Sequence, residues 1–216
     1  MHELPDRLDA VLTVVHLLYT TGHTAREGER LVRPELVERA LGLARMLSSL
    51  MPDDREVRGL LALLLLNDAR RETRAGPGGR LLLLEEQDRS RWDGQAIAEG
   101  TELVRQALRR GRPGRFALQA AIAAVHAEAP TYADTDWHEI LGLYNALLAV
   151  CRSPVVELNR AELPGPPPRG GHGGPGASRL QLRSACRGRT PLPRGGRRAR
   201  LWVGGWRTAW PARHRP

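Results

Sequence analysis

The chain has 216 residues and a formal net charge of +9, and this charge is unevenly distributed. Residues 1–161 hold 23 acidic residues against 21 arginines, whereas residues 162–216 hold 12 arginines against one glutamate. The basic balance therefore belongs to the tail, and it gives no reason to expect nucleic acid or an anionic surface on the first 161 residues. All 33 basic residues are arginine, which together with abundant alanine, glycine and proline is typical of GC-rich codons.

Targeting signals and cysteine usage favour a cytoplasmic protein without a membrane span. The first 20 residues lack the basic start and small-residue cleavage site of a signal peptide. The longest apolar run, residues 60–66, is far shorter than the roughly 20 residues that cross a bilayer. Cys151 and Cys186 have no metal-ligand spacing, so a reducing compartment is expected.

Apolar residues at helical spacing predict seven helices along residues 1–161. They are expected at about residues 6–20, from 34 to 50, from 53 with an apolar interior at 57–66, and at 95–110, 116–128, 137–151 and 154–161. Residues 81–94 follow neither a helical nor a strand period and are interpreted as a partly buried crossing loop. Because no segment alternates as a half-buried strand would, the predicted fold class is all-α.

Three helix starts carry capping signals. Asp53 and Glu56 have the spacing of a capping box, and the nearly all-apolar residues after them indicate a central helix. Asp136 with Glu139 repeats the pattern. At the last helix, Ser153 is suited to accept hydrogen bonds from the first free amides, and proline at the next position fits the first helical turn.

The last helix is followed by a change of composition that divides the chain. From residue 164 a proline or glycine falls at almost every other position, so neither a helix nor a strand ladder can continue. We therefore predict a helical domain at residues 1–161 and a disordered Arg/Gly/Pro-rich tail at 162–216. The abrupt loss of periodicity suggests the hypothesis that the tail is an out-of-frame reading of the gene.

Helix lengths and short connections predict antiparallel helical hairpins. The stretch "WHEILGLYNALLAVCRSPVVELNRA" has an aromatic residue opening one helix, a tyrosine seven residues later, a leucine pair and a proline that starts the next helix. This pattern is typical of a tetratricopeptide-like hairpin, which buries its face by stacking on another hairpin.

Several blocks resemble the C-terminal extension of one group of bacterial extracytoplasmic-function (ECF) sigma factors. They include "LPDRLDAVLTVVHLLY", "LVRPELVERALGLARMLSSLMPDDREVRGLLALLLLNDAR", "LLLLEEQDRSRWD", "IAEG", "ALRRGRPGRFALQAAIAAVHAEAPTYADTDW" and "SPVVELNRA". The resemblance covers residues 3–161. In that family the extension follows two helical domains that read DNA and polymerase, and it ends in tetratricopeptide-like repeats. Both promoter-reading domains are expected to be missing from this chain.

The resemblance implies a regulatory or interaction domain of a sigma factor that takes part in transcription initiation through protein contacts. The implied partners are core RNA polymerase, the sigma-factor domains of the parent protein, or both. No specific DNA contact, membrane contact, cofactor, metal or catalytic activity is expected. The alternative is a stand-alone helical-repeat adaptor that binds a protein partner.

This chain departs from the family at two polar motifs. The family's Asn-Glu-Gly-Tyr after the first helix stands here as Thr-Thr-Gly-His at residues 20–23. Its His-Asp-Ala-Arg stands as Asn-Asp-Ala-Arg at residues 67–70. The resemblance therefore assigns no role to the residues that differ at these positions.

A helix end and the loop after it hold the candidate site residues. The predicted network consists of Asp68, Arg70, Glu86, Asp88, Arg89 and Trp92. A buried carboxylate here requires an arginine partner, so we expect Asp68 or Asp88 to pair with Arg70 or Arg89. Anchoring of the loop is the favoured role, and contact with a partner is the alternative.

Two other groups of residues have a structural and a functional interpretation. The acidic residues and histidines at 126–139 suit a metal or acid–base site, but helix caps in a solvated loop explain them better. In the tail, Trp202, Trp206 and Trp210 among arginines suit nonspecific nucleic-acid binding. Meaningless GC-rich translation is the favoured interpretation there.

Overall fold

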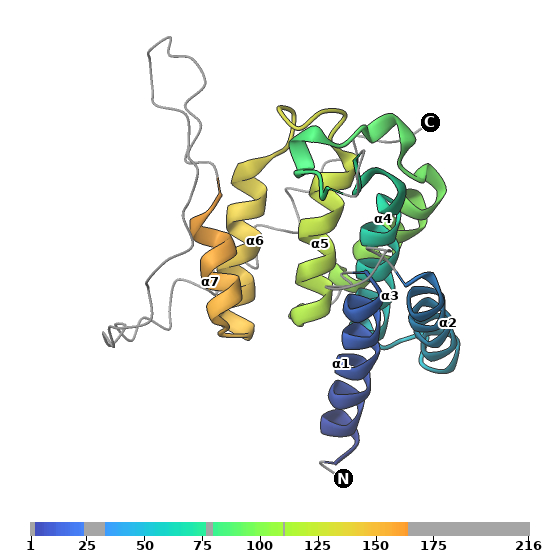
Figure 1. Ribbon diagram of the computed structural model, residues 1–216. Coiled ribbons are helices and arrows are strands. Elements are labelled where there is room, and N and C mark those ends of the chain that lie inside the picture. Colours follow the sequence, from blue (N-terminus) through green and yellow to red (C-terminus); the bar gives the residue numbers. More distant parts are fainter. Residues whose placement is uncertain (1–2, 24–32, 77–79, 110, 164–216) are drawn as a thin grey trace. The chain divides into compact units, whose positions relative to one another are not determined.

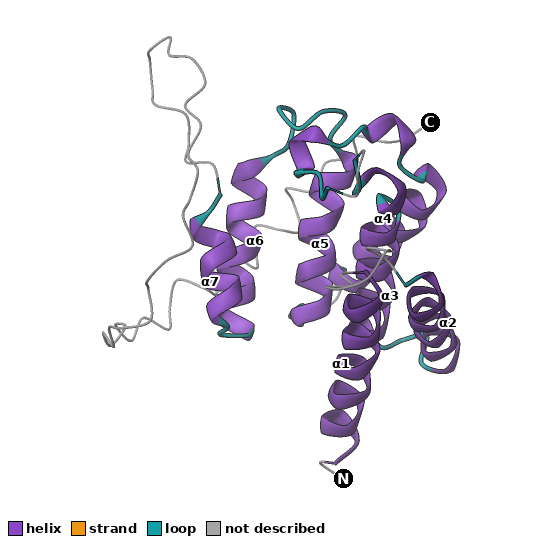
Figure 2. Ribbon diagram, in the orientation of Figure 1, coloured by secondary structure: helices purple, strands orange, loops and turns teal. Residues whose placement is uncertain are grey.

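The computed structural model describes residues 3–23, 33–76, 80–109 and 111–163. Within these residues every regular element is a helix, apart from one isolated bridge between Ala75 and Leu81 (Figure 2). The prediction of an all-α fold is confirmed for this part of the chain. The tail predicted to be disordered lies, from residue 164 on, outside the described residues.

Seven α-helices and three short 3₁₀ turns follow one another in the described residues. The α-helices are α1 (Glu3–His23), α2 (Pro34–Leu50), α3 (Arg55–Asp68), α4 (Gly94–Leu108), α5 (Arg115–Glu128), α6 (Trp137–Val150) and α7 (Pro154–Ala161). The 3₁₀ turns are η1 (Arg71–Thr73), η3 (Leu84–Glu86) and η4 (Arg89–Arg91). All three lie in the connection between α3 and α4, so the segment predicted as a loop contains local helical turns.

Successive helices run in opposite directions and pack side by side (Figure 1). Besides its neighbours in sequence, α3 also packs against α1 and α5. Contact between every second helix is what a stack of helical hairpins requires. As a result, the C-terminal ends of α1, α3 and α5 meet at one end of the stack, where the long connection between α3 and α4 crosses them.

The core is centred on α3, as its apolar sequence predicts. Every residue from Gly59 to Leu66 is buried, and so is Val57. Such a helix needs neighbours on all sides, and it packs against α1, α2, α4 and α5. The backbones of α3 and α5 approach closely at Gly59, where an added Cβ would lie 2.5 Å from the backbone nitrogen of Ala117. Glycine at this position therefore sets the distance between α3 and α5.

The start of α3 corrects one sequence prediction. The capping residue is Asp54, whose side chain accepts hydrogen bonds from the amides of Glu56 and Val57 at 2.9 Å each. Asp53 lies outside the helix, and its carboxylate is 3.6 Å from Arg58. Two consecutive aspartates allow either register, and the sequence pattern selected the wrong one.

Glu56 instead serves a helix 60 residues further along the chain. Its two carboxylate oxygens accept hydrogen bonds from the amides of Phe116 and Ala117, at 2.9 and 3.2 Å. These are amides of the first turn of α5, whose own capping residue is Gly114 and has no side chain to offer. A Cβ added at Gly114 would overlap the carboxyl group of Glu56. Glycine therefore makes room for a cap supplied by α3.

The two later capping predictions have different outcomes. Asp136 accepts a hydrogen bond from the Glu139 amide at 2.9 Å, which confirms the predicted cap of α6. Ser153 occupies the capping position of α7, but its side chain makes no capping hydrogen bond. The helix still begins at Pro154 and ends at Ala161. None of the described helices is long and apolar enough to cross a membrane.

Candidate functional site

The predicted network of six residues is divided among separate local clusters. Asp68 lies at the last residue of α3 and forms a two-pronged ion pair with Arg71, with N–O distances of 2.8 and 2.7 Å. The expected partner Arg70 does not bind it. At this point the chain leaves α3 and enters the tighter 3₁₀ turn η1. As a result Arg71, three residues after Asp68, faces the Asp68 carboxylate, whereas Arg70 turns inward.

Among the six predicted residues, Arg70 is the one whose charge is least balanced by neighbouring groups. Its Nη2 donates to the Asn67 side-chain oxygen at 3.1 Å, whereas its buried Nε has no hydrogen-bond partner. Burial lowers the pKa of Arg70 to about 10, and the positive charge of Arg74 acts in the same direction. No carboxylate in the described residues forms an ion pair with it. A charged group held in this way favours an anion nearby.

Glu86 and Asp88 lie on the outer side of the loop, and neither pairs with Arg89. Glu86 binds Arg80, with N–O distances of 3.2 and 2.9 Å, and accepts the Leu83 amide. The hydrogen bond from Arg80 is also the largest cause of the lowered pKa of Glu86. Asp88 caps η4 by accepting the amide and hydroxyl of Ser90, and these bonds lower its pKa. Both carboxylates therefore hold the local turns of the loop.

Arg89 connects the loop to the end of α5, and Trp92 connects it to η1. Nη1 of Arg89 donates to the carbonyls of His126 and Ala129 at the C-terminal end of α5, at 2.5 and 2.7 Å. Its guanidinium also lies 4.9 Å from the centre of the Trp92 ring. The indole is buried and donates to the Thr73 hydroxyl at 2.9 Å. A cation at the last carbonyls of a helix is electrostatically favourable.

One contact of this loop, with the end of α1, was not expected from the sequence. Arg74 donates to the carbonyl of His23, the last residue of α1, at 3.0 Å. His23 itself is buried, with its ring stacked on Tyr19 at a centroid distance of 4.9 Å. Burial lowers the pKa of His23 to about 3, and Arg74 adds to that effect. The polar motif at residues 20–23 therefore ends α1 directly against the arginines that follow α3.

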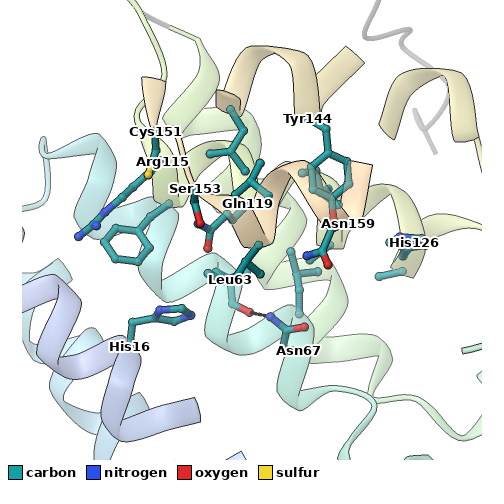
Figure 3. Close-up of a pocket in the computed structure, with 18 of the residues that line it drawn as sticks. His16, Leu63, Asn67, Arg115, Gln119, His126, Tyr144, Cys151, Ser153 and Asn159 are labelled. Carbon is teal, nitrogen blue, oxygen red and sulfur yellow. Dashed lines mark hydrogen bonds between the residues drawn. The ribbon is translucent and has the colours of Figure 1, made fainter. Parts of the chain in front are cut away.

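A groove of about 530 Å³ runs along α5, and we call it the α5 groove (Figure 3). Its floor is the face of α5 from Arg115 to Ala127. One side is formed by α1 and α3, which contribute His16, Leu63 and Asn67, and the other by α6 and α7, which contribute Tyr144, Cys151 and Asn159. Arg70, Leu84 and Trp92 also line it. It thus joins the candidate network to the last helical hairpin.

Polar groups that line the α5 groove are neutral or cationic. None of the lining residues is an aspartate or glutamate, while Arg70, Arg115, His16 and His126 are among them. Burial lowers the pKa of His126 to about 4, and the charges of Arg70 and Arg89 add to the shift. Burial and then Arg115 lower the pKa of His16. Both imidazoles are consequently neutral at pH 7, and the two guanidiniums carry the charge of the groove.

Ring packing, a turn hydrogen bond and a helix cap hold the side chains of residues 126–139 in place. The His126 ring lies edge-on to Trp137 at a centroid distance of 5.4 Å, and Tyr132 meets the same indole at 5.1 Å. Asp134 and Thr131 bind one another across the turn at 2.6 Å. Among the described residues, no three histidine, cysteine, aspartate or glutamate side chains are placed to hold a metal ion.

Comparison with known proteins relates this chain to one family and one curated protein. Residues 7–108, which cover most of α1 and all of α2 to α4, match the model of a family described as "Family of unknown function (DUF6596)". The chain is also 44% identical over 156 residues to "Uncharacterized protein R00370" of Rhizobium meliloti (strain 1021). That similarity covers 72% of this chain and 37% of the relative, so the chain spans well under half of the relative's length. No solved structure matches the chain.

Proposed function

We propose that this chain is the C-terminal extension of an ECF sigma factor and that it acts in the cytoplasm by protein contact during transcription initiation. The partner is core RNA polymerase or the DNA-reading sigma domains, and no bond is made or broken. The resemblance of residues 3–161 to that family supports the assignment. The observation that supports action by contact is the outer face of α1.

The outer face of α1 is apolar and exposed. Val11, Val14 and Leu17 recur every three residues and have 45%, 64% and 56% of their surface exposed. The opposite face of the same helix is buried through Leu12, Val15 and Tyr19. A helix that needs only to pack on its own core carries polar residues on its outer face, so a contiguous exposed apolar face favours a protein partner.

The position of α1 fits this partner. In the family that the chain resembles, the extension follows the DNA-reading domains, so α1 is the helix next to them. An apolar contact there would fix the orientation of the sigma domains relative to the helical stack. Because α1 also packs on α2 and α3, the contact would be made by a supported surface rather than by an isolated helix.

A binding experiment with a matched pair of variants tests the proposal. Immobilised full-length chain is exposed separately to purified core polymerase and to the purified sigma domains of an ECF factor. The variant V14D/L17D is expected to lose at least ten-fold in affinity for the partner that binds the native chain. The control V155D/L158D places the same charges on exposed residues of α7 and is expected to bind as the native chain does. Absence of binding to both partners, or equal losses in both variants, contradicts the proposal.

A further inference from the structure

We propose that the α5 groove binds a small carboxylate with an elongated apolar body, with its carboxylate at Arg70. The inference does not depend on the sigma-factor assignment, because it rests on the size, lining and charge of the groove. It adds a ligand site to a chain whose proposed role is protein contact.

The dimensions of the groove suit a small elongated molecule. Its volume of about 530 Å³ lies within the range of about 300–1,000 Å³ that small-molecule sites occupy. The floor extends along α5 from Arg115 to Ala127, a distance of about 18 Å at the 1.5 Å rise of an α-helix. A groove of this length matches an extended alkyl chain, whereas a docked helix would need a cylinder about 10 Å across. A single alkyl chain fits such a channel better.

The walls offer apolar contact along most of this length. The apolar lining residues include Leu63 and Leu66 of α3, Ile122 of α5, and Leu147 and Val156 of the last hairpin. Transfer of a hydrocarbon body from water to this surface is favourable by about 25 cal/mol for each Å² buried. The apolar body of the ligand accounts for affinity, and the polar groups at the ends of the groove account for selectivity.

Charge complementarity assigns an anion to the end of the groove near Arg70. The Arg70 residue is half-buried, donates to the neutral side-chain amide of Asn67 and forms no ion pair within the described residues. At the other end Arg115 already binds Asp9 at 2.9 Å. A carboxylate at Arg70 would therefore neutralise the charge that lacks a partner, and the absence of acidic residues in the lining removes any competing repulsion.

The wall formed by α6 and α7 is suited to adjust to such a ligand. Among the described elements, this wall contacts the rest of the helical stack mainly where α6 packs on α5, and α7 is held mainly by its contact with α6. The other wall belongs to the helices around α3. A ligand between the two walls would contact both, so binding would also stabilise the position of the last hairpin.

Titration calorimetry of the full-length chain tests the proposal with three matched probes. Sodium decanoate supplies the carboxylate and a ten-carbon body, 1-decanol has the same body without charge, and decyltrimethylammonium bromide carries the opposite charge. We expect decanoate to bind with one-to-one stoichiometry and at least ten-fold more tightly than either control. Equal affinity for the three probes, or no binding of decanoate, would overturn the proposal.

Variants place the binding in the groove. Arg70→Gln is expected to weaken decanoate at least ten-fold and to leave decanol unchanged, whereas Arg45→Gln, which removes an exposed charge outside the groove, changes neither. Ala123→Phe fills the floor and is expected to abolish binding, and Ala98→Phe on the exposed face of α4 is its control. Ala127→Phe repeats the block if Ala123→Phe does not fold. Equal effects of the two arginine variants, or binding that persists in the folded blocked variant, would contradict the site.

Discussion

The helices around α3 and the α6–α7 hairpin are predicted from equally clear sequence patterns, but they are stabilised very differently. α3 is buried along most of its length and packs against four other helices. α7 buries a single residue, Val156, and leaves Val155 and Leu158 64% and 49% exposed. The comparison shows that helix formation and helix anchoring are separate properties. A local pattern predicts the first, whereas the second depends on how many neighbours the fold supplies.

The largest expected effect is a core truncation in α3. Leu64→Ala removes a side chain with no exposed surface and is expected to lower the free energy of unfolding by about 4 kcal/mol. Val156→Ala, in α7, is expected to cost about 1 kcal/mol because a smaller group is removed from a partly supported helix. Urea unfolding measures both values. Hydrogen exchange should show that Val156→Ala lowers protection in α6 and α7 while α3 keeps its protection, and equal loss throughout the chain would contradict the comparison.

Acid pH is expected to weaken the α3 side of the molecule through His23. Its pKa is about 3 in the folded chain, against 6.5 when unfolded, because burial disfavours the imidazolium. Between these values the unfolded chain binds a proton that the folded chain does not, so stability falls as pH falls below 6.5. At pH 5 this contribution is about 2 kcal/mol, from 1.36 kcal/mol per pH unit.

The variant His23→Gln isolates this effect, since glutamine can accept the hydrogen bond of Tyr19 without titrating. The difference in unfolding free energy between pH 7.5 and pH 5 should be smaller by about 2 kcal/mol in the variant. Chemical denaturation at both values measures the difference. An unchanged pH dependence would show that the imidazole is protonated as easily in the fold as in the unfolded chain.

A pair of cap substitutions compares the two helices of the last hairpin. Asp136→Ala removes the hydrogen bond to the Glu139 amide and is expected to cost about 1 kcal/mol. Ser153→Ala removes a side chain that makes no capping bond, so its effect on the free energy of unfolding should be close to zero. Thermal and urea unfolding check both. A larger loss for Ser153→Ala would mean that the serine caps α7 in solution.

The smallest expected effect comes from the ion pair that connects α2 and α4. Arg45 and Glu99 form two hydrogen bonds at 2.7 and 3.0 Å, but both side chains are exposed. A double-mutant cycle of Arg45→Ala and Glu99→Ala should give a coupling energy of about 0.5 kcal/mol or less, decreasing with added salt. A coupling above about 1.5 kcal/mol would show that surface charge, in addition to burial, holds the helices around α3.

Helix positions were predictable where the signal is local. Asp136 with the apolar repeat after it predicts the start of α6, and the structure agrees. The buried face of α6 differs from the apolar repeat, because Leu143 is buried together with Ile140 and Leu147. At α3 the position of the helix was correct and the identity of the cap was wrong, because Asp53 and Asp54 are chemically equivalent in sequence. The 3₁₀ turns between α3 and α4 have no periodicity of their own, so they appeared as a loop.

The candidate site shows where sequence reasoning stops. Arg89 binds a carbonyl at the end of α5, whereas Trp92 binds Thr73 within the same connection between α3 and α4. The pairings were wrong, because they depend on how the chain turns after Asp68 and before Ser90. The α5 groove was missed altogether. It draws its residues from five helices, and no sequence pattern reports which of them face a common space.

The carboxylate of Glu56 has a consequence for how this chain can be divided or assembled. The first amides of α5 are satisfied by a side chain that precedes them by 60 residues, so α5 has a complete N-terminus when α3 is already beside it. A fragment that began after α3 would leave two amide donors of α5 without this acceptor, however favourable its own helix propensity. The cap of one helix is thus a residue of another, and dividing the chain between them removes that cap.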